Sequence, residues 1–175
     1  MNLPNRLTLT RIFLIPVCVF LQLTDRYPWA LGVFLAACLT DFLDGYLARK
    51  NGQVTVFGKF ADPVADKLLV LCAMIALTSQ GRLSAWCVCV VAARELAVDG
   101  LRLVAAGRNI VVAAGWAGKV KTCLQMLCVV LCMLSAFADI GAWLITLSSA
   151  LMAAATVYSG FLYFRDLRGV FAPEA

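Results

Sequence analysis

Six apolar segments, separated by short polar breaks, run along the chain. Among the stretches that lack a charged residue, only Ile140–Phe164 is longer than about 18 residues, the usual length of a confident membrane span. The others reach that length if each helix continues past the charged residues at its end. They are Ile12–Thr24, Tyr27–Thr40, Leu68–Gly81, Leu83–Ala93 and Thr122–Ala138. The pattern predicts six helices, over residues 7–24, 28–49, 59–79, 83–106, 117–138 and 140–165.

The breaks between these helices contain residues that favour turns. Examples are Asn51-Gly52, Gln80-Gly81 and Gly107-Arg108-Asn109. The segment 50–57 could form a short strand, but its length favours a loop.

Composition excludes most classes of protein. Of the 175 residues, 63% are hydrophobic and 14% are charged, and the mean hydropathy is +0.90. A soluble domain has about 45–50% apolar and about 25% charged residues. A water-soluble globule, a disordered chain and a secreted disulfide scaffold are therefore excluded. We expect an all-α polytopic membrane protein with six transmembrane helices, folded as a single domain over residues 1–175. No cleavable signal pattern is present, so we expect the first apolar segment to be a span.

Basic residues are distributed unevenly between the two sides of the predicted bundle. Six spans put both termini on one side, and 13 of the 15 Lys and Arg residues fall on that side. Arg26 and Arg82 fall on the other. The positive-inside rule then places both termini in the cytoplasm. A net charge of +5, dispersed in this way, indicates topology and no nucleic-acid partner.

Histidine is absent, and the eight cysteines form no CxxC pair. A zinc or iron–sulfur site is therefore not expected, and we interpret the cysteines as small apolar residues within helices. Without histidine, acid–base chemistry near neutral pH must use a carboxylate, a lysine, a tyrosine or a cysteine.

Four of the ten acidic residues cluster on the two sides of one predicted helical hairpin. Asp41 and Asp44 are three residues apart, and Asp62 and Asp66 are four apart, so each pair shares a helix face. Both pairs lie at similar distances from the turn near Gln53 and can converge across the helix contact. Ionisable groups inside apolar helices are costly, so their presence indicates a function.

Four converging carboxylates require cations, because like charges at short range cannot all stay ionised alone. Two divalent ions would balance them, and ligands that are all oxygen favour Mg²⁺ or Mn²⁺. Two such ions can clamp a phosphoryl group during displacement. Arg49 and Lys59 lie at the rim, where phosphate needs partners, while Gly45, Ala48 and Gly58 leave room for a ligand.

The same positions form an extended motif. It reads Asp41-x-x-Asp44-Gly45-x-x-Ala48-Arg49, eight further residues, and then Gly58-x-x-x-Asp62-x-x-x-Asp66. The motif resembles the signature of the CDP-alcohol phosphotransferases at every fixed position. Softer segments are similar to those of bacterial phosphatidylglycerophosphate synthases over nearly the whole chain. These are Asn5-x-x-Thr8-x-x-Arg11, Ala61–Lys67, Ala93-Arg94-Glu95, Gly100-Leu101-Arg102 and Gly118–Thr122.

The resemblance implies a membrane enzyme with its active site facing the bacterial cytoplasm. Such enzymes transfer the phosphatidyl group of CDP-diacylglycerol to sn-glycerol 3-phosphate, release CMP, and are usually homodimers. The resemblance implies that Asp41, Asp44 and Asp62 bind metal, and that Asp66 is the general base and also touches a metal. The residues that it places around the CDP group are Asn5, Thr8, Gly45, Ala48, Arg49 and Gly58.

The residues themselves favour direct displacement on the donor. No activated Ser or Cys nucleophile is evident, so a covalent intermediate is not favoured. Because the chain has no histidine, a carboxylate must take the proton of the acceptor hydroxyl. A doubly charged acceptor also needs a basic pocket. The candidates, all expected on the cytoplasmic side, are Arg94, Arg102, Lys119 and Lys121. If these residues are only topology anchors, the phosphate must bind at Arg11, Arg49 or Arg108.

Two alternatives remain open at this point. The same donor could serve another acceptor: serine, inositol phosphate or phosphatidylglycerol. A cation transporter would also use carboxylates in the membrane. Its site would lie at the midplane, between inverted repeats, whereas these carboxylates lie near the expected cytoplasmic ends and the sequence contains no internal repeat.

Overall fold

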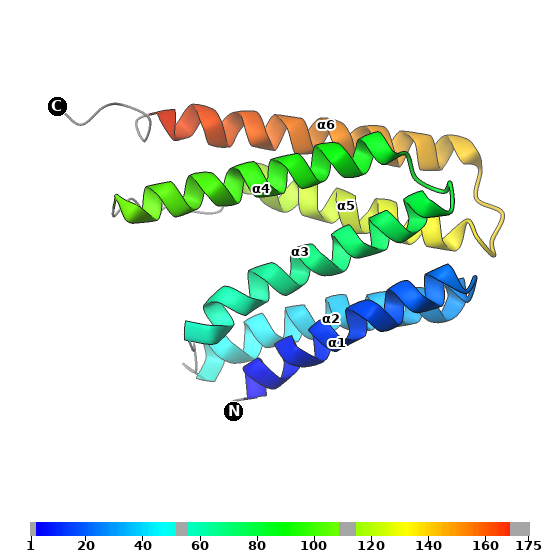
Figure 1. Ribbon diagram of the computed structural model, residues 1–175, viewed down its shortest axis with the longest axis horizontal. Coiled ribbons are helices and arrows are strands. Elements are labelled where there is room, and N and C mark those ends of the chain that lie inside the picture. The colour runs from blue at the N-terminus through cyan, green and yellow to red at the C-terminus, as the bar shows by residue number, and fades with distance from the viewer. Residues whose placement is uncertain (1–2, 52–55, 109–114, 169–175) are drawn as a thin grey trace. The chain divides into compact units, whose positions relative to one another are not determined.

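The computed structural model describes the backbone of residues 3–51, 56–108 and 115–168, and the side chains of residues 8–40, 62–108 and 115–168. Within these ranges it is all-helical, with six helices and no strand (Figure 1). The helices are α1 (Leu3–Leu23), α2 (Tyr27–Asn51), α3 (Val56–Ser79), α4 (Ala85–Gly107), α5 (Trp116–Leu134) and α6 (Ala142–Asp166). The all-α class and the six helices are confirmed. Residues 52–55, in the predicted loop, lie outside the described ranges.

The chain packs as two compact units. The first unit comprises Met1–Leu83 and Val129–Ile140, and the second comprises Ser84–Cys128 and Gly141–Ala175. The prediction that residues 1–175 form a single domain stays a prediction.

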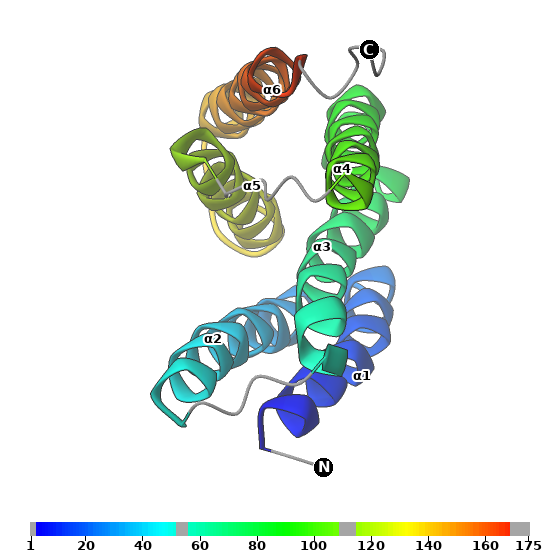
Figure 2. The same cartoon turned by 90° about the vertical axis from the view of Figure 1, so that its left-hand side faces the viewer.

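In the first unit, α1 packs along both α2 and α3 (Figures 1 and 2). Small residues are buried on the two partner helices, among them Ala30 and Ala37 on α2 and Ala65 and Ala73 on α3. Small side chains let helix backbones approach closely. The close packing brings polar side chains of α1 within bonding distance of α3.

The α1–α2 and α3–α4 turns have the same construction, a Schellman motif. Asp25 follows α1 with a φ of 58°, and the N–H of Arg26 donates to the carbonyl of Leu21 at 2.8 Å. Gly81 follows α3 with a φ of 70°, and the N–H of Arg82 donates to the carbonyl of Leu77 at 2.9 Å. Glycine adopts this left-handed conformation without steric cost.

These two turns are bonded to each other. Gln80 Nε2 donates to the carbonyl of Gln22 at 2.8 Å, and the hydroxyl of Tyr27 donates to Gln80 Oε1. Arg82 Nε donates in turn to the Tyr27 hydroxyl at 3.0 Å. Both turns therefore lie at one end of the first unit. If successive helices cross the membrane in alternating directions, the turns that carry Arg26 and Arg82 must lie at the same end. These are the two basic residues expected on the side opposite the termini.

In the second unit, α4 packs against α6. Val98, Leu101 and Ala105 of α4 form a buried cluster with Tyr163 of α6 and Leu167, the residue that follows α6. The α4 residues recur at spacings of three and four, so they form one stripe along the helix. The stripe places the polar end of Tyr163 beside the charged residues of α4.

Two helices, α5 and α6, are long and apolar enough to cross a membrane by length and composition. The described parts of α3 and α4 are interrupted by charged residues, and those of α1 and α2 contain the shorter apolar segments Thr8–Leu23 and Tyr27–Thr40. Six helices are thus confirmed, while six spans and the cytoplasmic position of the termini stay predictions.

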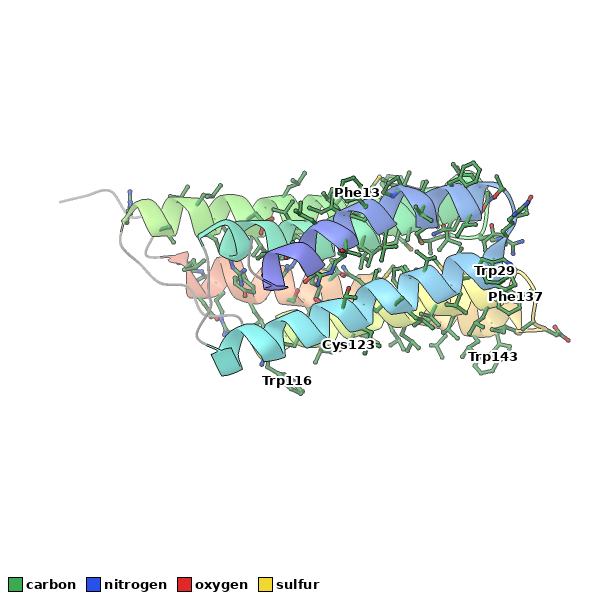
Figure 3. All side chains as sticks on the ribbon, turned by 90° about the horizontal axis from the view of Figure 1, so that it is seen from below. Phe13, Trp29, Trp116, Cys123, Phe137 and Trp143 are labelled. Carbon is green, nitrogen blue, oxygen red and sulfur yellow. The ribbon has the colours of Figure 1, made fainter. Side chains whose placement is uncertain are left out.

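Large apolar side chains are nevertheless exposed on all six helices. Phe13 on α1 is 72% exposed, and Trp86 on α4 is 80% exposed. Trp116 on α5 and Trp143 on α6 point away from the helices that carry them (Figure 3). Exposing apolar surface of this kind to water is unfavourable. Such exposure on every helix is typical of a protein that lies in an apolar solvent.

Candidate active site

Two polar contacts join α1 to α3 at the aspartates of α3. The hydroxyl of Thr8 donates to Asp62 Oδ1, and Nη1 of Arg11 lies 3.0 Å from Asp66 Oδ1. Thr8 and Arg11 are three residues apart on α1, while Asp62 and Asp66 are four apart on α3, so each pair advances about one helical turn. The two contacts fix the register of α1 against α3.

Burial differs sharply between the two sides of these contacts. Thr8 and Arg11 are fully buried, whereas Asp62 is half-buried and the side chain of Asp66 is 34% exposed. A buried guanidinium is costly unless it is paired, and a charge-assisted bond to a carboxylate supplies the pairing. The two carboxylates are therefore anchored from α1 and remain accessible from outside.

The other predicted donor-site residues lie on described helices, but their side chains lie outside the described set. On α2 these are Asp41, Asp44, Gly45, Ala48 and Arg49; Gly58 lies on α3 and Asn5 on α1. The convergence of four aspartates therefore stays a prediction. Of the ten residues predicted around the donor and the metals, Thr8, Asp62 and Asp66 have described side chains.

The described part of the site fits a hard divalent ion. Asp62 and Asp66 present partly exposed carboxylate oxygens from neighbouring turns of α3, and such oxygens suit Mg²⁺ or Mn²⁺. Among the side chains that the structure describes, no group of three or more His, Cys, Asp or Glu is placed so that it could hold a metal ion. Asp41 and Asp44 are not among those side chains, so half of the predicted ligand set is described.

A second polar cluster lies in the second unit, centred on Glu95 of α4. Its carboxylate forms an ion pair with the ammonium of Lys121 on α5, and Arg94 Nη1 lies 3.5 Å from Glu95 Oε2. Lys121 Nζ also lies 3.4 Å from Gln125 Oε1. Glu95, Lys121 and Gln125 are all buried. Lys121 therefore neutralises a buried carboxylate, a role for which its position in the sequence gave no indication.

Tyr163 of α6 joins the same cluster. Its hydroxyl accepts a hydrogen bond from Arg102 Nη2 at 2.6 Å and one from the backbone N–H of Gly115 at 3.3 Å. The guanidinium carbons of Arg94 and Arg102 each lie 5.2 Å from the centre of the ring. Sequence reasoning missed Tyr163. The available signal was a tyrosine in a long apolar segment, whose hydroxyl needs a partner when buried.

The structure thus brings together three of the four predicted acceptor residues, Arg94, Arg102 and Lys121, while Lys119 is exposed. The Nε atoms of Arg94 and Arg102 are buried and have no hydrogen-bond partner among the described residues. Buried cationic donors that are incompletely paired favour an anion. The cluster is therefore suited to receive one.

The sequence matches known proteins over most of its length. The model of the CDP-alcohol phosphatidyltransferase family matches residues 1–159. The CDP-diacylglycerol–glycerol-3-phosphate 3-phosphatidyltransferase of Bacillus subtilis is 41% identical over 188 residues, covering 93% of this chain and 93% of its own. The protein of the same name from Rickettsia typhi is 37% identical, covering 97% of this chain and 99% of its own. That from Escherichia coli K12 is 43% identical, covering 71% and 72%.

Proposed function

Because the chain belongs to the CDP-alcohol phosphatidyltransferase family, we propose that it transfers the phosphatidyl group of CDP-diacylglycerol to sn-glycerol 3-phosphate. The products are phosphatidylglycerophosphate and CMP, so the enzyme acts in phospholipid biosynthesis. The observation that carries this proposal is the similarity, over nearly the full length of both chains, to a relative that bears this activity in its name.

The reaction is a direct displacement in which Asp66 is the general base. A hydroxyl oxygen of the acceptor attacks the phosphorus of the donor's phosphatidyl group. A new P–O bond forms, the P–O bond to CMP breaks, and its electron pair leaves on the CMP phosphate. The hydroxyl proton passes to the Asp66 carboxylate. Two observations support this role: the contact with Arg11 orients the Asp66 carboxylate, and the partial exposure of its side chain leaves it accessible to an acceptor.

The family generally depends on a divalent metal. We place two ions, Mg²⁺ or Mn²⁺, at Asp41, Asp44, Asp62 and Asp66. When bound, they would neutralise charge on the pyrophosphate and improve CMP as a leaving group. The oxygen donors of Asp62 and Asp66 fit such ions.

The CDP group would be lined by residues of α1, α2 and α3: Asn5, Thr8, Gly45, Ala48, Arg49 and Gly58. Thr8 has a more specific role in this proposal. Because its hydroxyl donates to Asp62, it orients that carboxylate.

The acceptor phosphate would bind to the cluster of the second unit, with Arg94 and Arg102 as its principal contacts. Their buried Nε atoms, which have no hydrogen-bond partner among the described residues, support this assignment. Lys119 would add charge at the exposed edge. Lys121, whose charge is paired with Glu95, would contribute through the cluster as a whole.

The enzyme would span the bacterial cytoplasmic membrane six times, with both termini and the active site on the cytoplasmic side, and would form a homodimer. The exposed apolar side chains on all six helices support residence in lipid. The common position of the Arg26 and Arg82 turns at one end of the first unit supports the alternation of the first spans.

Swapping the acceptor in a CMP-release assay tests the proposed function. Purified protein in detergent or vesicles is given CDP-diacylglycerol and Mg²⁺, with glycerol 3-phosphate, serine, inositol phosphate or phosphatidylglycerol. We expect CMP release that depends on glycerol 3-phosphate. Release with another acceptor instead would move the enzyme to a different branch of the family, and no release with any acceptor would reject the activity.

A further inference from the structure

Tyr163 makes more polar contacts than its packing requires. It is 8% exposed and belongs to the apolar cluster with Val98, Leu101, Ala105 and Leu167. A phenylalanine would fill that space equally well. The hydroxyl accepts two hydrogen bonds, from a guanidinium of α4 and from the backbone N–H of Gly115 just before α5. One atom of α6 therefore ties α4 to the start of α5.

The ring of Tyr163 also lies beside two cations. The guanidinium carbons of Arg94 and Arg102 are both 5.2 Å from its centre, a distance at which an aromatic ring attracts a cation. Two arginines eight positions apart on one helix repel each other unless something between them compensates. The shared ring supplies attraction to both, and the hydroxyl fixes the orientation of Arg102.

Gly160, one turn before Tyr163, makes room for this arrangement. A Cβ at position 160 would lie 3.3 Å from Cγ of Arg94, closer than an ordinary van der Waals contact. The absence of a side chain lets the stem of Arg94 pass against α6 and reach the ring. The same stretch of α6 thus provides both the gap and the ring.

We propose that Tyr163 is the positioning residue of the acceptor site: its hydroxyl and ring hold Arg102 and Arg94 in the arrangement that binds the phosphate dianion of the acceptor. This inference rests on the proposed function. Fixing the two guanidinium groups before the substrate arrives removes the entropy cost of ordering them during binding. The effect of Tyr163 should therefore fall on acceptor binding and pass through Arg102.

The test compares Tyr163→Phe with the wild-type enzyme in steady-state assays with varied glycerol 3-phosphate and varied CDP-diacylglycerol. Tyr163→Phe keeps the ring and removes the hydroxyl. We expect the acceptor KM to rise about three- to tenfold, with kcat and the donor KM within twofold of wild type. Tyr158→Phe is the matched control, because Tyr158 lies on the same helix and is 60% exposed. It should leave all three parameters unchanged.

A double-mutant cycle with Arg102→Gln separates positioning from a general structural effect. If Tyr163 acts through Arg102, adding Tyr163→Phe to Arg102→Gln changes the acceptor KM little further. An unchanged acceptor KM in Tyr163→Phe overturns the proposal. It is also overturned by an equal rise in both backgrounds, or by a rise matched in the donor KM and accompanied by a lower Tm. Failure of the proposed function is distinct: the wild-type enzyme would then release no CMP with glycerol 3-phosphate.

Discussion

The guanidinium of Arg11 lies 3.0 Å from the carboxylate of Asp66, and no part of the Arg11 side chain is exposed. One turn earlier on both helices, Thr8 donates to Asp62. The first helix, which precedes the aspartate motif, therefore contacts two of the aspartates of the proposed active site. Its side chains bind the two carboxylates of α3, and both carboxylates remain partly exposed.

Arg11→Gln should lower kcat at least tenfold and reduce the free energy of unfolding by about 1.5–3 kcal/mol, since it removes a charge-assisted bond to the partly exposed Asp66 carboxylate. Arg11→Lys keeps the charge but loses the planar donor geometry, so its rate and stability should lie between those of the wild type and Arg11→Gln. Steady-state rates and thermal unfolding in detergent measure both effects. Arg26→Gln, at an exposed turn, is the control. A wild-type rate and Tm in Arg11→Gln would show that the ion pair does not support the site.

Thr8→Val should raise the Mg²⁺ concentration needed for half-maximal activity by about tenfold. Valine has nearly the shape of threonine but cannot donate to Asp62, and loss of a group that orients a metal ligand typically costs about 10–100-fold in metal affinity or activity. A Mg²⁺ titration of CMP release measures the shift. Thr24→Val, at an exposed position, should behave as wild type. An unshifted titration in Thr8→Val would remove Thr8 from the metal site.

Asp66→Asn should abolish turnover while the donor KM changes little, because proton removal acts on the transition state. Asp62→Asn should instead weaken the binding of Mg²⁺ as well as lower the rate. Rates measured over a range of donor and Mg²⁺ concentrations separate the two effects. Normal turnover with a raised donor KM in Asp66→Asn would make Asp66 a binding residue.

Glu95→Gln should reduce the free energy of unfolding by about 3–5 kcal/mol, because it leaves the buried ammonium of Lys121 without its carboxylate. The double variant Glu95→Leu/Lys121→Met should recover most of this loss, since replacing both charges by apolar groups removes the uncompensated charge. Denaturation of the purified variants in detergent gives the values. If the loss of stability in the double variant equals the sum of the losses in Glu95→Leu and Lys121→Met alone, the two residues are not a coupled pair.

The helices and the aspartate motif could be predicted from the sequence because both are local patterns. Apolar segments and turn residues located all six helices, and the spacing of Asp62 and Asp66 located their shared face. Thr8–Asp62 and Arg102–Tyr163 join positions 54 and 61 residues apart. No local pattern reports such a pair, because each contact depends on how helices pack.

The roles of the charged residues of α4 and α5 could also not be predicted from the sequence alone. Composition and topology placed Arg94, Arg102 and Lys121 among the candidates for an acceptor site. Which of them bind a ligand and which pair with another residue of the protein could not be decided without the positions of Glu95 and Tyr163. The structure pairs Lys121 with Glu95 and leaves Arg94 and Arg102 beside Tyr163.

The stoichiometry of the reaction is the sharpest test of the proposed phosphatidyl transfer. Purified protein is incubated with CDP-diacylglycerol, glycerol 3-phosphate and Mg²⁺, and CMP and phosphatidylglycerophosphate are both quantified, with Asp66→Asn as the control. We expect equal amounts of the two products from the wild-type protein, loss of both in excess EDTA and recovery when Mg²⁺ is restored. CMP without phosphatidylglycerophosphate, or full turnover in excess EDTA, would contradict it.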